Sequence, residues 1–202
     1  MKTTVTENDS QENLMPEESF QIISAMINTA KNKLADDGFH LIFWGWLVTI
    51  CALTQYITLK LNIEWGGWVW MLMPLGGIIS GIYGYKQGKK QKVKTHIDVY
   101  LGYVWGGFIV AMFITLAFGN IHGIKATYFF LMLLYGLATL ITGGILNFKP
   151  LIYGSLFSFA FAILSVFLGE VDQFLCISGA LLLSYVIPGH LLRAKFKSQQ
   201  HA

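Results

Sequence analysis

Charged residues are scarce in this sequence: Asp, Glu, Lys and Arg together make up 12% of its 202 residues. A typical soluble domain carries about twice that share, and uses it to cover its surface. Hydrophobic residues reach 54%. The composition therefore excludes a disordered chain, a nucleic-acid-binding domain and an ordinary water-soluble enzyme, and it indicates an integral membrane protein.

Cysteines and catalytic motifs are also scarce. The two cysteines, Cys51 and Cys176, both lie inside apolar stretches. They are too few for a disulfide framework, and their spacing does not fit a metal site. The sequence has no metalloprotease, nucleophile-elbow, Walker or paired-carboxylate motif. We therefore predict no catalytic residues, no metal and no cofactor.

Long apolar stretches are what the sequence does contain. A helix needs roughly 20 apolar residues to cross a bilayer core of about 30 Å. Six stretches meet this requirement, and none has an acidic or basic residue in its central part. We expect an all-α integral membrane bundle of six transmembrane helices, within a domain spanning residues 39–194. The expected spans are 40–60, 66–86, 98–119, 124–146, 150–169 and 173–193.

The basic residues predict the orientation, because cytoplasmic loops are enriched in Lys and Arg. With both termini in the cytoplasm, 12 of the 14 basic residues lie inside, and Lys60 and Lys125 lie outside. Clusters of this kind also attract anionic lipid. We expect such lipid at six basic residues: Lys86, Lys89, Lys90, Lys92, Lys94 and Arg193. The loop that holds the five lysines could instead bind an acidic partner.

The two ends of the chain are polar. Residues 1–15 are acidic and without periodicity, so we expect disorder there, and residues 195–202 form a basic cytoplasmic tail. Residues 16–38 predict an amphipathic cytoplasmic helix, with Pro16 at its start and Gly38 as a cap at its end. This helix either covers the inner face of the bundle, lies along the membrane surface or pairs with a partner helix. Its apolar residues at helical spacing are Phe20, Ile23, Ile27, Ala30 and Leu34.

Small residues four apart indicate where membrane helices approach each other closely. Such pairs pack either within the chain or between two copies in a homodimer. The candidates are Gly77 and Gly81, Gly102 and Gly106, and Gly154 and Ser158.

A few polar groups offer sites for ligands. Gln55 and Pro74 could line a small cavity, because proline frees a backbone carbonyl in its helix. That interpretation favours a transporter or channel for a small neutral or apolar solute. A second set, expected at the inner interface, would instead suit a membrane-embedded enzyme with a His/Asp site. This set comprises Tyr85, His96, Asp98 and His190.

Four stretches resemble a family of small multi-pass bacterial inner-membrane proteins: residues 38–46, 74–85, 143–150 and 187–190. The resemblance implies the bacterial inner membrane and carries no activity with it. We predict a non-enzymatic interaction or regulatory protein, with transport and membrane-embedded catalysis as alternatives. Its expected partners are the lipid bilayer, a protein at the cytoplasmic face or a second copy of the chain, and no nucleic acid.

Overall fold

The computed structural model describes residues 16–90 and 96–200, with side chains at 20–24, 38–86, 88–89, 96–119, 121, 123 and 125–195. Every element within these residues is a helix, which confirms the all-α prediction. The elements are α1 (Pro16–Lys60), η1 (Glu64–Met71), α2 (Leu72–Lys90), α3 (His96–His122), α4 (Ile124–Ile145), α5 (Lys149–Val166), α6 (Gln173–Leu181), η2 (Leu182–Val186) and α7 (Ile187–Gln200).

Six helical segments of the described chain are long and apolar enough to cross a membrane. The prediction of six spans is therefore confirmed, and the chain is a polytopic helical membrane protein. The segments begin and end within three residues of the expected boundaries. They are Gly38–Lys60, Glu64–Lys86, His96–Gly119, Lys125–Ile145, Lys149–Val166 and Gln173–Lys195.

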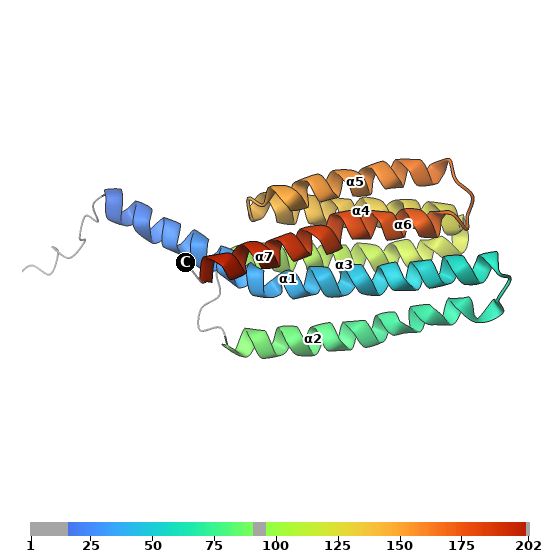
Figure 1. The fold of residues 1–202 in the computed structure, drawn as a ribbon, viewed down its shortest axis with the longest axis horizontal. Helices are drawn as coiled ribbons and strands as arrows, with labels where there is room; N and C mark the ends of the chain where they lie inside the picture. Colours follow the sequence, from blue (N-terminus) through green and yellow to red (C-terminus); the bar gives the residue numbers. More distant parts are fainter. Residues whose placement is uncertain (1–15, 91–95, 201–202) are drawn as a thin grey trace, which may run out of the picture.

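The helices lie side by side and run up and down through one bundle (Figure 1). Its centre is the composite helix α6–η2–α7, which packs between α1 and the α4–α5 hairpin. By contrast, α2 packs mainly on α1 and η1, and α3 packs mainly on α4. We call the end that holds Lys86, Lys149 and Lys195 the basic end. At the other end, the Lys60 ammonium lies 3.2 Å from the Asp172 carboxylate.

Glycines allow the closest helix contacts in the centre. A Cβ on Gly154 of α5 would lie 2.9 Å from both the Leu183 carbonyl oxygen and the Ser184 Cα in η2. A Cβ on Gly45 of α1 would lie 2.8 Å from a methyl group of Val186. The backbone of η2 is therefore held between α5 and α1, at distances that only glycine permits.

Two segments depart from α-helical geometry, and a proline follows each of them. The 3₁₀ segment η1 ends three residues before Pro74, and the π-helical segment η2 ends two residues before Pro188. Proline has no N–H, so it cannot donate the α-helical hydrogen bond to a carbonyl of the preceding turn. A change of helix type before the proline pairs the carbonyls of that turn with other N–H groups, so fewer of them lack a donor. The sequence predicted a freed backbone carbonyl at Pro74 but not these changes of helix type.

The first helix is longer than the sequence suggested. Gly38 does not end a helix, because α1 continues unbroken from Pro16 to Lys60. The physical reason is contact: a Cβ at Gly38 would lie 3.5 Å from the Gly189 carbonyl oxygen of α7, so this glycine lies at a helix–helix contact. At the other terminus, α7 continues to Gln200, into the expected tail. The prediction of disorder in residues 1–15 lies outside the described residues.

Candidate functional site

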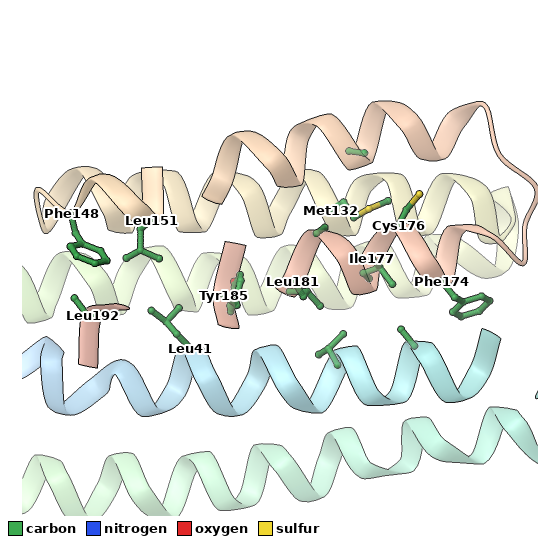
Figure 2. Close-up of a cluster of buried hydrophobic side chains, with 14 of the residues drawn as sticks. Leu41, Met132, Phe148, Leu151, Phe174, Cys176, Ile177, Leu181, Tyr185 and Leu192 are labelled. Carbon is green, nitrogen blue, oxygen red and sulfur yellow. The ribbon is translucent and has the colours of Figure 1, made fainter. Parts of the chain in front are cut away.

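Tyr185 lies at the centre of the bundle, in the π-helical segment η2. Figure 2 shows it between a group of buried side chains toward the basic end and a second group toward the opposite end. Its ring is 2% exposed and meets Trp105 of α3 and Tyr135 of α4 edge-on, with centroids 6.1 and 5.5 Å away. Three elements thus meet through one aromatic cluster. π-Helical segments often occur at functional sites.

Several buried polar atoms in the spans have no hydrogen-bond partner among the described residues. Unpaired polar groups are costly in the hydrocarbon region, where water is absent. These atoms therefore mark the positions at which the bundle interior is polar. They are one oxygen each of Thr49, Gln55, Thr142 and Gln173.

A polar contact joins α1 to α2 near the basic end. The Trp44 indole N–H donates to the Ser80 hydroxyl oxygen at 3.2 Å, and that oxygen lies 2.8 Å from Nδ1 of His40. Tyr83, one turn after Ser80, meets the His40 ring edge-on at 5.4 Å. A neutral His40 that accepts at Nδ1 carries its proton on Nε2. Side-chain hydrogen bonds thus supplement the apolar packing between these two helices.

Sequence reasoning missed this contact. The expected spans 40–60 and 66–86 contain His40 and Ser80, but nothing in the sequence connects the two residues. The residue types were compatible with such a contact, since a histidine at the edge of one span can hydrogen-bond to a hydroxyl in the next. The two residues are 40 positions apart, however, and the sequence does not show which positions of the two helices lie at the same level.

Replacing Ser80 with alanine is expected to lower the free energy of unfolding by about 1 kcal/mol, because it removes both interhelical bonds inside the membrane. Thermal unfolding of the full chain in detergent measures this change. Ser178→Ala is the matched control, since the Ser178 hydroxyl donates only to Phe174 within its own helix. Equal melting temperatures for the two variants would show that the contact contributes nothing to stability.

The two residues predicted to line a cavity point in different directions. Gln55 is buried on α1, on the face that also carries Cys51 and Thr58. This face is covered by η1, since Cys51 contacts the Val69 carbonyl and Thr58 packs on Gly66. Pro74 is exposed on α2. The structure therefore places these two residues apart, one inside the bundle and one on its surface.

The residues predicted for the inner interface are spread over three helices. Tyr85 on α2, His96 on α3 and His190 on α7 are exposed, and Asp98 on α3 is half-buried. Lys89 lies over the Tyr85 ring, 4.7 Å from its centroid. Among the side chains that the structure describes, no group of three or more His, Cys, Asp or Glu residues is able to hold a metal ion.

The predicted lipid-contacting residues lie at the basic end as far as they are described. Lys86 and Lys89 are exposed near the end of α2, and Arg193 is exposed on α7. Lys92 and Lys94 lie outside the described residues, and only the backbone is described at Lys90.

The small residues predicted to pack form two groups. Gly154 lies against η2, and the Ser158 hydroxyl donates to the Met132 carbonyl of α4 at 2.9 Å. The second group faces outward: within the described chain, a Cβ placed on any of these glycines would meet nothing within 4 Å. Its members are Gly77 and Gly81 on α2, and Gly102 and Gly106 on α3.

Comparison with known proteins adds no family. No family model, no curated protein and no solved structure matches this chain.

Proposed function

We propose that this chain is a non-enzymatic membrane protein that acts by binding a transmembrane helix of a second protein molecule, either a different protein or another copy of this chain, along α2 and α3. The observation that carries the proposal is the outward exposure of these two helices. Only 11% of the second span's apolar segment and 6% of the third's are buried inside the molecule, against 61% of the sixth's. One third of the bundle's spans thus offers almost its whole surface to other molecules.

The outward-facing glycines distinguish this surface from one that merely contacts lipid. Glycine destabilises a helix by about 1 kcal/mol relative to alanine, and contact with lipid does not offset this cost. A close contact with another helix offsets it, because small residues allow the two backbones to approach each other. Gly45 and Gly154 illustrate such contacts inside this same bundle. We infer that Gly81 and Gly106 serve an equivalent contact with a second molecule.

The N-terminal part of α1 offers a further surface for a partner. It extends past the end of the bundle (Figure 1), and its side chains Phe20 and Ile23 are 71% and 54% exposed. We place this segment, both termini and the basic end on the cytoplasmic side of a bacterial inner membrane. This orientation follows from the distribution of Lys and Arg, and it brings Lys86 and Lys89 to the anionic headgroups.

Photo-crosslinking tests the proposal in membranes. A photoreactive side chain is placed at Ile78, which is 60% exposed on α2, or at Leu164, which is 47% exposed on α5. We expect the Ile78 probe to yield a protein adduct of one discrete mass, and the Leu164 probe to label lipid. Gly81→Val should abolish the Ile78 adduct, because the added methyl groups hold the two backbones apart.

The outcomes separate the alternatives. An adduct of twice the chain's mass that is lost in Gly81→Val supports the proposal with a second copy as the partner. Lipid adducts alone at both positions would contradict it. A protein adduct that survives Gly81→Val would also contradict it, because the contact would not depend on the glycine face.

A further inference from the structure

The N-terminal part of α1 leaves apolar side chains uncovered beyond the end of the bundle (Figure 1). We call residues 16–37 of this helix the arm. The side chains of Phe20, Ile22 and Ile23 are 71%, 45% and 54% exposed. The first span begins at Gly38, and Phe20 lies roughly 27 Å before it along the unbroken helix. These side chains therefore lie outside the hydrocarbon core, where exposed apolar surface marks an interaction site.

One side of the arm carries apolar residues at a regular spacing. They follow one another at alternating steps of three and four residues: Phe20, Ile23, Ile27, Ala30 and Leu34. Residues at this spacing share one side of a helix, and α1 is helical throughout this stretch. The same alternation forms the a and d positions of a coiled coil, at which two helices pack together. We call these five residues the seam, and its spacing fits a second helix.

The seam continues the side of α1 that packs on α7. A Cβ at Gly38 would lie 3.8 Å from the Cβ of Arg193, and Leu34 lies one turn before Gly38 on the same side. Beyond Arg193, α7 continues only to Gln200, which is about 10 Å and reaches the level of about residue 31. The outer part of the seam extends past the end of α7, and its side chains Phe20 and Ile23 are exposed.

The membrane determines how the arms of two copies can meet. The bias of Lys and Arg toward one side gives every copy the same orientation in the bilayer. The arms of two copies therefore project in the same direction and begin at the same depth. When two arms pair, they are parallel and in register, so each seam residue lies opposite its own counterpart. Each arm also continues a packed helix, so pairing does not require the costly nucleation of a new one.

The lysines of the arm are compatible with this pairing. With Phe20 at position a, Lys31 takes position e and Lys33 takes position g. In a parallel coiled coil, each g position lies beside the e position of the other helix that comes five residues later. Lys31 therefore lies beside Met26 of the second copy, and Lys33 lies beside its Gly38. Neither lysine meets a like charge across the seam.

Acidic residues lie at the two ends of the seam. Glu17 and Glu18 precede it by one turn, and Asp36 takes position c, which points away from the second helix. Asp37 takes a d position, where two carboxylates would face each other and oppose pairing. The seam therefore ends before Asp37, close to the contact between α1 and α7. At this level the two α1 helices separate and enter their own bundles.

We propose that two copies of this chain pair through their arms, in a short parallel coiled coil beyond the end of the bundle. The proposal rests on the proposed function in one respect, because it names the partner of the N-terminal surface of α1. It is separate from the contact along α2 and α3. So short a seam would be marginal between free peptides. Anchoring in one membrane raises the effective concentration of the two arms and aligns them.

Disulfide crosslinking of the full chain in membranes tests this proposal. One cysteine is introduced by Ile23→Cys, in the seam, or by Gln21→Cys, at the outward position b; both side chains are exposed in the single chain. On mild oxidation, we expect Ile23→Cys to give a species of twice the chain's mass. Gln21→Cys and the wild type should stay monomeric, because the native Cys51 and Cys176 are buried.

A pair of charge variants tests whether the seam causes the crosslink. Ile27→Glu places two carboxylates opposite each other in the seam and should abolish the crosslink of Ile23→Cys. Asn28→Glu is the matched control, since it adds the same charge one residue later, at position b, and should retain the crosslink. The Ile78 photo-adduct should still form in Ile27→Glu. Failure of the arm contact and failure of the contact along α2 and α3 therefore give different results.

Other results would overturn the proposal. Equal crosslinking through Ile23→Cys and Gln21→Cys would indicate random collisions of the arms. Equal loss of the crosslink in Ile27→Glu and Asn28→Glu would attribute it to charge and not to the seam. A disulfide between Ile23→Cys and a different protein, without the doubled chain, would show that the partner is not a second copy. Loss of the crosslink in Gly81→Val would mean that the arms meet only through the contact along α2 and α3.

Discussion

Replacing Tyr185 with alanine is expected to lower the free energy of unfolding by about 3–5 kcal/mol, because it leaves a cavity where three elements meet. The ring is buried, and it touches Trp105 of α3 and Tyr135 of α4. Loss of the ring removes its contacts with α3 and with α4 at the same time. Thermal unfolding in detergent, followed by helical circular dichroism, measures the change.

Two variants test this explanation. Tyr103→Ala removes the same side chain from α3, where it is 77% exposed, and should change stability by less than about 0.5 kcal/mol. Tyr185→Phe keeps the ring and removes only the hydroxyl, whose hydrogen-bonding partner is Thr139, so the loss of stability should be no more than about 1 kcal/mol. If Tyr185→Phe were as unstable as Tyr185→Ala, the hydroxyl rather than the ring packing would carry the effect.

Replacing Gly154 with valine is expected to destabilise the fold by about 1–3 kcal/mol or more. The new Cβ would lie 2.9 Å from the Leu183 carbonyl oxygen and from the Ser184 Cα. Both are backbone atoms, so no side chain can turn away to make room. The α5 helix would have to move away from η2, and we expect a lower melting temperature for the full chain in detergent.

Gly81→Val is the matched control for this change. It makes the same substitution in another span, at a position where a Cβ meets nothing within 4 Å in the described chain. Its melting temperature as an isolated chain should equal that of the wild type. A comparable loss in both variants would mean that valine weakens these helices through intrinsic helix propensity, not through contact.

Hydrophobicity alone predicted the number and limits of the spans. The boundary at Lys60, for example, follows from the length that a bilayer core requires. The inward faces could not be predicted in the same way. Gly154 and Gly81 stand in similar small-residue patterns, yet one is buried and the other faces outward. In a membrane span both faces are apolar, so the periodicity that marks the core side of a soluble helix is absent.

Contacts between residues that are far apart in the sequence could not be predicted either. The pairing of Ser80 with His40 depends on the register between two helices, which the loop between them does not determine. The position of Lys195 over the Phe148 ring depends on how α7 lies beside the turn between α4 and α5. The enrichment of Lys and Arg in cytoplasmic loops predicts which side of the membrane the basic residues lie on. It does not predict which of them are neighbours on that side.

The unbroken first helix has a consequence for the N-terminal segment. Ile23 precedes Gly38 by 15 residues, which is roughly 22 Å along a helix axis. The headgroup layer on each side of a bilayer is only about 5–8 Å thick. To lie flat in that layer, the segment would need a sharp bend near Gly38, whereas α1 continues through that position. We therefore expect α1 to hold Phe20 and Ile23 past the end of the bundle (Figure 1), on the same unbroken helix that packs at Gly45.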